Sequence, residues 1–516
     1  MAVAVVVAGC GVGRTDDTDY RGAIVVGTTD KIYSIDPAKS YDNGSWQTEI
    51  QVYPFLMNYR PGSVVPEPDA AESCGFAEPT RYVCTLKAGL AFANGHPLTA
   101  RSVKGSFDRV LKIDDPDGPA ALLGNLHHTD AVDDRTVAFT LKVPDQTFPA
   151  LLATPATPIV DESVFPADRV LGDDAIVAAR PFAGPFTIAG YAKNRLVEFR
   201  ANPAYRGILG RAKAGIVASK FYTSGENMKM DLQNGALDAA YRTLGPQDVD
   251  TLRRSKKVKV YTGPGGELRF LTFNLKTMPG GDDAGKLAVR KAVAVSVDRE
   301  ALARDVYRDT YRPAYSTVPQ GLPGAASSFK DVYGAKPNRQ AAAGFLAAAG
   351  VRTPVRIQLQ YNSDHYGASS AEEYAAIKSQ LEATGLFRVN LQSTEWVTYN
   401  EERTKDSYPV FQLGWFPDYP DADNYLTPIL GPNNMTKNHF SSPDVNELLA
   451  REIGEPDPAA RRALLGRIQR LAAEAYLPVL PLVSGEQIAV AANDIRGVQD
   501  TLDASFRFRL STLSRS

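Results

Sequence analysis

Strand-like and helix-like segments alternate along nearly the whole chain of 516 residues, and no fixed-period repeat is visible. Short apolar runs such as 23–28 and 268–274 predict strands, whereas the longer segments 339–349 and 458–476 predict helices. This alternation indicates an α/β protein. At about 150 residues per domain, the length indicates roughly three domains or subdomains.

Charged residues are nearly balanced, with 57 Lys and Arg against 59 Asp and Glu and a net charge of −2. Since there is no basic excess, nothing favours a nucleic-acid partner, and the hydrophobic content of 44% is ordinary for a soluble globular protein. The chain has only three Cys and five scattered His, so we expect no metal centre and no cofactor.

Residues 1–9 (MAVAVVVAG) form an apolar run that ends in small residues directly before Cys10. The run is far shorter than the roughly 20 residues that span a bilayer. Residues 7–10 resemble the lipobox of bacterial lipoproteins, in which a signal peptidase cuts before the cysteine and the thiol carries a diacylglycerol. The resemblance predicts a signal-peptide remnant, a lipidated Cys10 with a polar tether over 10–20, and anchoring to the outer face of the bacterial cytoplasmic membrane. The missing basic region predicts a natural start further upstream; the alternative is an apolar N-terminus with a chance cysteine.

Cys74 and Cys84 flank the turn-like pair Glu78 and Pro79, and the segment around Cys84 alternates like a strand. The two cysteines could therefore face each other across a hairpin. Export would place them in an oxidising compartment, which favours a disulfide over the alternative of two buried free thiols.

Residues 256–267 (KKVKVYTGPGGE) combine a short strand with a Gly/Pro-rich break. Glycine absorbs backbone rotation at little cost, so this segment is the best candidate for a hinge; an ordinary loop is the alternative. No Gly-Lys-Ser/Thr follows, which excludes a phosphate loop.

Four further segments have distinctive patterns: FANGHPLTARSVKGSFDR at 92–109, GPFTIAGYAKNRLVEFRANPAY at 184–205, VRKAVAVSVDRE at 289–300 and WFPDYPDADNY at 415–425. Each resembles a motif of the peptide/nickel-type extracellular solute-binding proteins (family 5) of ABC importers, and the four occur in that family's order. In the first segment, Thr99 is a suitable helix N-cap. With the lipobox and the length, the resemblance covers nearly the whole chain.

The resemblance implies a two-lobed, periplasmic-binding-protein-like α/β fold (class II, cluster C type) with an extra subdomain inserted in the first lobe. Lobe I would comprise 21–56, 180–264 and 483–516, the extra subdomain 57–179, and lobe II 268–482. The resemblance also implies a monomeric binding protein, not an enzyme, which captures di- or oligopeptides between its lobes and delivers them to the permease subunits of an ABC importer. A ligand that touches both lobes would shift the population toward the closed form.

A peptide ligand presents an ammonium group whose burial requires an opposite charge. The resemblance assigns this role to Asp418, three residues after Trp415, where Pro417 and Pro420 would stiffen the backbone. Trp415 would supply a flat apolar wall, and Tyr419 is a further candidate ligand contact. Without the resemblance, a Pro/Asp-rich stretch is usually an exposed turn and a tryptophan usually a core residue.

The other candidate ligand-binding residues are Gln412, Arg403, Asn43, Gly44 and Ser45. Gln412 lies in a strand-like run, and cleft strands can hydrogen-bond an extended ligand. Arg403 is a candidate for the ligand carboxylate, with a solvated helix-face position as the alternative. Residues 43–45 lie in an early loop that borders the cleft in the family, and their neighbours Tyr41 and Trp46 either line the site or pack in the core.

Three other interpretations remain open, of which one is a non-transport role, such as a peptide-sensing receptor or a component of a biosynthetic cluster. Ser327 and Lys330 form an S-x-x-K pattern, as in penicillin-recognising serine enzymes, but no K-T-G accompanies it. The same fold could instead bind a nickel chelate, haem, an opine or an oligosaccharide. The histidines that could then serve a metal or haem are His96, His127, His128, His365 and His439, although the adjacent His127 and His128 are expected to diverge as exposed loop residues.

Overall fold

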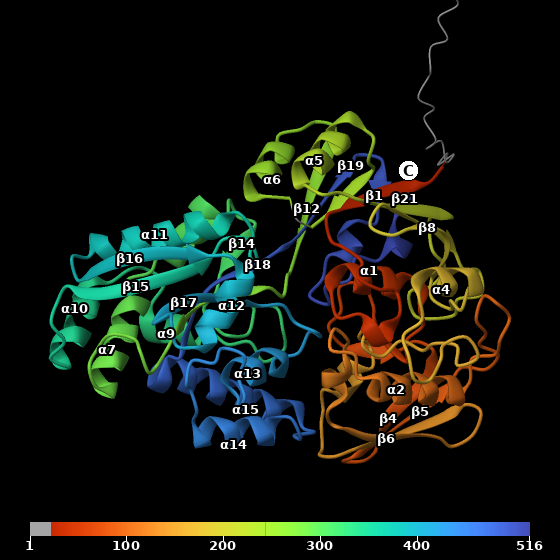
Figure 1. The fold of residues 1–516 in the computed structure, drawn as a ribbon, viewed down its shortest axis with the longest axis horizontal. Helices are drawn as coiled ribbons and strands as arrows, with labels where there is room; N and C mark the ends of the chain where they lie inside the picture. The colour runs from red at the N-terminus through yellow and green to blue at the C-terminus, as the bar shows by residue number, and fades with distance from the viewer. Residues whose placement is uncertain (1–21, 243) are drawn as a thin grey trace, which may run out of the picture.

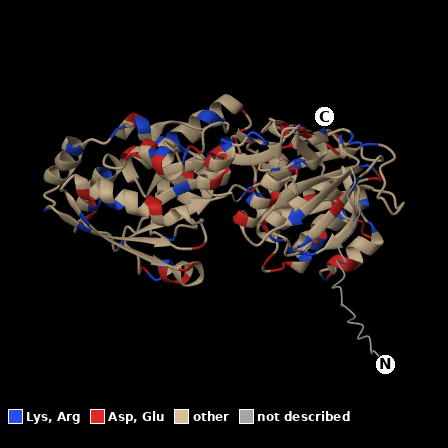
Figure 2. Cartoon of the chain, turned by 90° about the horizontal axis from the view of Figure 1, so that it is seen from above, with Lys and Arg blue, Asp and Glu red and all other residues tan. Residues whose placement is uncertain are grey.

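The computed structural model describes residues 22–242 and 244–516, which form two lobes side by side (Figure 1). We call the part built on a seven-stranded sheet lobe I and the part built on a six-stranded sheet lobe II. Lys and Arg are interspersed with Asp and Glu over both lobes (Figure 2). No helix of the described ranges combines the length and apolar character that crossing a bilayer requires. The predicted lipobox and tether, with Cys10, lie outside the described residues.

The sheet of lobe I joins strands from three distant parts of the chain. In spatial order they are β12 (Val258–Gly263), β19 (Gln487–Ala492), β11 (Ala239–Tyr241), β1 (Ile24–Thr28), β10 (Ile216–Phe221), β9 (Leu196–Ala201) and β8 (Phe186–Ala192). β1 runs parallel to β10 and β11, and the other pairs are antiparallel. α1 (Asn43–Val52) and α4 (Asp173–Ala179) pack on one face, and α5 (Gly225–Asn234) and α6 (Pro246–Arg253) on the other.

A smaller four-stranded antiparallel sheet adjoins lobe I, with the order β4 (Ala71–Glu78), β5 (Arg81–Leu86), β7 (Thr136–Leu141) and β6 (Leu126–Ala131). Helix α2 (Ala100–Ile113) shares its apolar core. Thr99 caps α2 as predicted, since its Oγ1 accepts from the backbone N–H of Arg101 at 3.2 Å. The strand pair β2 (Met57–Tyr59) and β3 (Pro66–Pro68) and the short helix α3 (Phe148–Leu151) complete this subdomain.

The predicted disulfide is confirmed within this small sheet. Cys74 of β4 pairs directly with Cys84 of β5 across the hairpin, and their sulfur atoms are bonded. The cross-strand register therefore places the two thiols directly opposite each other.

Removing this bridge should destabilise the subdomain. The disulfide joins residues only 10 positions apart, so its loss in a Cys74→Ser, Cys84→Ser double variant should cost about 2–3 kcal/mol of unfolding free energy. Urea unfolding followed by a probe in the four-stranded sheet measures this change. An equal midpoint for the variant and the oxidised wild type would contradict the expected contribution.

Lobe II has a mixed sheet between two layers of helices. The strand order is β14 (Tyr311–Pro313), β18 (Val479–Gly485), β13 (Leu268–Phe273), β17 (Val410–Trp415), β15 (Val355–Asn362) and β16 (Phe387–Thr394). One face is covered by α7 (Asp283–Ala294), α9 (Ser328–Tyr333), α10 (Arg339–Ala348) and α11 (Ser369–Ala383). The other is covered by α12 (Trp396–Thr404), α13 (Asp423–Leu430), α14 (Pro443–Glu452) and α15 (Pro458–Leu471).

Two chain segments connect the lobes. Residues 264–267 lead from β12 to β13, and Glu486 leads from β18 back to β19. The segments lie side by side, since the N–H of Gly485 donates to the carbonyl oxygen of Glu267 at 2.9 Å. A β-carbon on Gly265 would overlap the carbonyl oxygen of Gly485, so only glycine allows this close approach. The segment predicted as a hinge thus contains one of the two connections, and its motion stays a prediction.

Candidate ligand-binding site

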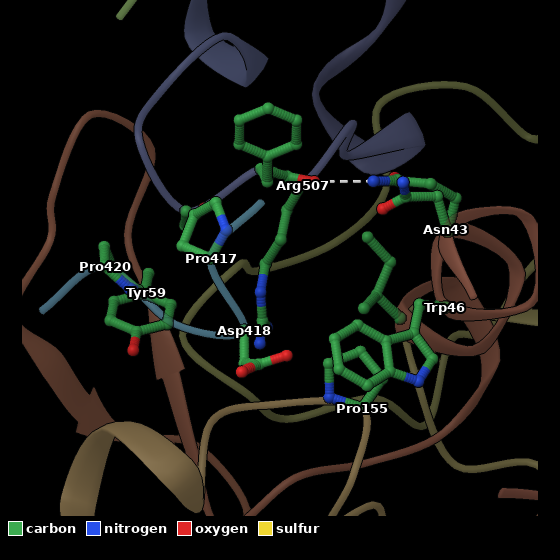
Figure 3. A pocket seen from close by; sticks show the side chains of 12 residues that line it. Asn43, Trp46, Tyr59, Pro155, Pro417, Asp418, Pro420 and Arg507 are labelled. Carbon is green, nitrogen blue, oxygen red and sulfur yellow. Dashed lines mark hydrogen bonds between the residues drawn. The ribbon is translucent and has the colours of Figure 1, made fainter. Parts of the chain in front are cut away.

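A small pocket lies between the lobes (Figure 3). Lobe II lines it with Pro417, Asp418 and Pro420, from the loop that follows β17. Lobe I lines it with the first turns of α1, with Tyr59 at the end of β2, and with the C-terminal segment 505–507. Pro155 completes the lining, so the pocket exists only because four segments far apart in the sequence meet at the boundary of the lobes.

Asp418 is held in a fixed orientation by contacts from both lobes. The hydroxyl of Tyr41, in lobe I, donates to Asp418 Oδ1 at 2.7 Å. In lobe II, Asn424 Nδ2 donates to Oδ2 at 3.1 Å, and the N–H of Asp418 donates to Asn424 Oδ1 at 2.8 Å. Asn424 lies in the first turn of α13, so the helix sets the direction of the carboxylate.

The charge of Asp418 has no cationic partner among the residues that the structure describes. Within the described part of the chain, no Lys, Arg or His nitrogen forms an ion pair with it, and desolvation in the pocket raises its pKa above the usual range. A half-buried carboxylate without a cation favours a positively charged guest, because an opposite charge offsets its desolvation. This arrangement can bind an ammonium group.

Three carboxyl groups surround one arginine behind Asp418. Arg461 of α15 donates two hydrogen bonds to Asp421, both at 2.8 Å, and one from Nε to Glu452 at 2.9 Å. Burial, followed by the charge of the neighbouring Asp423, raises the pKa of Glu452 to about 9. Because one guanidinium cannot balance three carboxylates, the cluster holds a proton at neutral pH.

Replacing Glu452 with glutamine should make stability less dependent on pH. The folded protein keeps a proton that the unfolded chain, with a pKa near 4.5, releases, so wild-type stability falls as the pH rises from about 4.5 towards 9. Glutamine imitates the uncharged form, and its advantage in Tm over the wild type should therefore grow with pH across this window. Thermal unfolding at several pH values measures it, and parallel Tm curves would contradict the assigned proton.

Residues 43–45, predicted to lie in a loop that borders the cleft, instead form the first turn of α1, because Asp42 caps a helix that begins at Asn43, and they contribute to the pocket only in part. Asn43 lines the pocket, whereas Gly44 and Ser45 do not. A β-carbon on Gly44 would overlap the carbonyl oxygen of Lys31, and Ser45 Oγ accepts from the backbone N–H groups of residues 33 and 34. Gly44 and Ser45 thus fix α1 against the preceding loop, and these contacts argue against their predicted ligand contact.

Trp415 and Tyr419 lie beside the pocket and do not line it. Trp415 ends β17 and packs on the core of lobe II, with Nε1 buried and donating to no described residue. The hydroxyl of Tyr419 lies 3.4 Å from Thr147 Oγ1, so it contacts the other lobe. The apolar walls come instead from Trp46 of α1 and from the two prolines of the lobe II loop.

Gln412 and Arg403 are engaged inside lobe II. Gln412 is 1% exposed; its Oε1 accepts from Asn362 Nδ2 at 2.8 Å, and its Nε2 donates to Ser370 Oγ at 3.1 Å. Arg403 is buried, and its Nη1 donates to the carbonyl oxygen of Met435 at 2.9 Å. These hydrogen bonds argue against the predicted ligand contacts, and the alternative of a solvated Arg403 is wrong because the α12 face that carries it is covered.

The histidines contribute nothing to the pocket lining. The expectation that His127 and His128 diverge is wrong, since their Nδ1 atoms lie 2.7 Å apart. A register shift between Leu126 and His128 in β6 breaks the alternation of sides and brings the two rings together. Across 22–242 and 244–516, no group of three or more His, Cys, Asp or Glu side chains could hold a metal ion.

Residues that the sequence analysis missed complete the site. Asn424 lies within the motif at 415–425, and the polar residue after Asp423 could have suggested its role. Phe506 and Arg507 lie outside every motif, and no short-range signal places the C-terminal segment beside α1. In the structure, Gln47 Nε2 donates to the carbonyl oxygen of Phe506 at 2.5 Å and holds this segment in place (Figure 3).

Two α/β lobes, two connecting segments and a pocket at their boundary define a solute-binding protein of the periplasmic-binding class. The chain belongs to the bacterial extracellular solute-binding proteins, family 5, whose model matches residues 65–437. Membership of this family and the two-lobed fold, both predicted from the sequence motifs, are confirmed.

Known relatives cover nearly the whole chain at low identity. The probable D,D-dipeptide-binding periplasmic protein DdpA of Escherichia coli is 23% identical over 511 residues, which cover 96% of this chain and 95% of that protein. The ABC transporter substrate-binding protein CtaP of Listeria monocytogenes superposes with a TM-score of 0.81 at 20% identity, covering 96% and 99% of the two chains. A dipeptide-binding protein from Pseudoalteromonas in complex with Met-Leu superposes with a TM-score of 0.74 at 19% identity, covering 96% and 100%.

Proposed function

We propose that this protein is an extracytoplasmic binding protein that captures di- or oligopeptides between its lobes and delivers them to the permease subunits of an ABC importer. The observation that carries the proposal is Asp418, a carboxylate without a cationic partner in a pocket between the lobes. The names of the relatives, a probable D,D-dipeptide-binding protein and a dipeptide-binding protein solved with Met-Leu, support a peptide as the guest.

The proposal includes a monomer with no cofactor and no catalytic activity, with an anchor on Cys10. Its lobes follow the predicted segments except at two boundaries, since β18 extends lobe II to Gly485 and α4 packs on the sheet of lobe I and not in the subdomain predicted at 57–179. Lipidation follows from the lipobox resemblance alone. Mass spectrometry of the membrane fraction of a bacterial host should find the diacylglyceryl group on Cys10, and Cys10→Ser should move the protein to the soluble fraction. A penicillin-type probe should leave Ser327 unlabelled.

The peptide assignment is tested in two steps. Native mass spectrometry of protein purified without denaturation gives the mass of any retained guest. A mass that matches a nickel chelate, haem, an opine or an oligosaccharide would contradict the peptide proposal.

In the second step, a mixed tripeptide library in free and N-acetylated forms is offered to the wild type. We expect the free library to bind and acetylation to weaken binding at least about tenfold, because acetylation removes the charge that Asp418 would pair. Equal binding of both forms would refute the role of Asp418.

A further inference from the structure

Arg242 of lobe I lies against two phenylalanine rings, one from each lobe. Its Cζ is 5.7 Å from the centroid of the Phe416 ring in lobe II and 5.6 Å from that of the Phe506 ring in lobe I. The two rings meet edge to face, with 6.2 Å between their centroids. Among the cation–ring contacts of the described residues, the contact of Arg242 with Phe416 is the one that crosses the boundary between the lobes.

The charge of Arg242 is balanced from its own lobe. β1 and β11 are parallel neighbours, so their carboxyl ends place Asp30 and Arg242 at one edge of the sheet of lobe I. Arg242 Nε lies 3.2 Å from Asp30 Oδ2, and the two side chains are only 16% and 13% exposed. The ion pair offsets the desolvation of the guanidinium, and exclusion of water strengthens the attraction of a cation to a ring.

The backbone is strained at both lobe I residues that contact Phe416. The φ angle is 62° at Arg242 and 61° at Phe506, in the left-handed region that residues with a side chain disfavour. Hydrogen bonds hold both in place: the N–H of Arg242 donates to the carbonyl oxygen of Ile488 at 3.2 Å, and Gln47 Nε2 donates to that of Phe506 at 2.5 Å. Strain of this kind gathers at functional sites such as ligand clamps, so it points to a role for this contact beyond the fold of lobe I.

Phe416 belongs to the loop that carries the candidate ammonium-binding carboxylate. It lies two residues before Asp418, and Pro417 between them restricts the backbone. Lobe I therefore contacts this loop at two points, through Arg242 on Phe416 and through the hydroxyl of Tyr41 on Asp418. A contact between lobes that forms when they approach favours the closed form over the open one.

We propose that Arg242 is a positioning residue that holds Phe416, and with it the loop of Asp418, against lobe I. We call the contact of Arg242 with Phe416 the latch. It involves no atom of a guest, so it raises the affinity for every guest by the same factor, whatever the terminal groups of the guest. The inference rests on the proposed capture of a guest between the lobes and adds to it a residue that acts on closure.

A double-mutant cycle tests the latch. Arg242→Met and Phe416→Leu each remove one partner of the cation–ring contact and keep an apolar side chain. Each should weaken binding of a free tripeptide selected from the library by about two- to thirtyfold, measured by calorimetric titration. The double variant should weaken it little more than either single variant, because the same contact is lost only once. The N-acetylated form of the peptide should lose the same factor as the free form in every variant.

The matched control is Arg200→Met. Arg200 is ion-paired with Glu198 at 3.2 Å on β9, near the other end of the sheet of lobe I, so its loss should leave the affinity unchanged. Phe416→Leu keeps the ion pair of Arg242 with Asp30, and it therefore tests the latch even if Arg242→Met fails to fold.

Two outcomes of the titrations would overturn the latch. One is an unchanged affinity of Phe416→Leu. The other is a set of losses that add in the double variant, because a purely structural Arg242 acts without Phe416. If the wild type binds no library member, the proposed peptide function fails, and small-angle X-ray scattering then tests the latch alone. Both single variants should have a larger radius of gyration than the wild type, and equal radii would refute the latch.

Discussion

Replacing Asp418 with asparagine should weaken binding of a free-amino peptide by about 2–5 kcal/mol and leave the fold intact. Asparagine has nearly the same shape: its Oδ1 can accept from Asn424 Nδ2 while its Nδ2 donates to the hydroxyl oxygen of Tyr41, so the pocket geometry should persist. Only the charge is lost, and the ammonium of the guest would then be desolvated without a counter-charge. Calorimetric titration with a tripeptide selected from the library measures the change.

The control for this variant is Asp444→Asn. Asp444 is an exposed carboxylate in the first turn of α14, outside the pocket lining, so its loss should leave the affinity unchanged. The Tm of Asp418→Asn should match that of the wild type. If the affinity of Asp418→Asn stays within a factor of about two of the wild-type value, Asp418 does not bind the ammonium of the guest.

Replacing Arg461 with methionine should lower the free energy of unfolding of lobe II by about 3–5 kcal/mol, the largest stability effect that we expect for a single side chain. Arg461 forms an ion pair with Asp421 and donates a hydrogen bond to Glu452, and its removal leaves the carboxyl cluster without a counter-charge. The loss should be smaller at acidic pH, because protonation relieves the repulsion among the remaining carboxyls. Because α13 begins at Asp423, the loop that carries Asp418 should loosen as well.

Denaturant unfolding of lobe II at two pH values measures the effect of Arg461→Met. The neighbouring Arg462 is exposed and serves as the matched control, since Arg462→Met should change stability by less than about 0.5 kcal/mol. If both variants unfold at the same denaturant concentration, the cluster is balanced by solvent or ions and not by Arg461.

Local chemistry made several elements predictable. The segment 339–349 forms α10 (Arg339–Ala348), followed by Gly350 with φ of 65°, the left-handed conformation expected of a glycine after a helix end. The segment 458–476 forms α15 and one further π-helical turn, Ala472–Tyr476. Both predictions rest on periodicity and on end signals that operate within a few residues.

The site was less predictable because its contacts are not local. Tyr41 and Asp418 are hydrogen-bonded although they lie 377 positions apart. Gln412 lies in a strand, and the alternation of side chains along a strand does not tell which of its two faces is buried. In lobe II, helices cover both faces of β17, so Gln412 is buried although it is polar. The family motif identified the loop of Asp418, but nothing in the sequence placed residues 505–507 opposite it.

The hydrogen bond from Tyr41 to Asp418 joins the two lobes directly. On the proposed function, the tyrosine hydroxyl holds the donor position that the ammonium of a guest would take over. Capture would then be an exchange of one donor for another, and its affinity would report only the difference between the two.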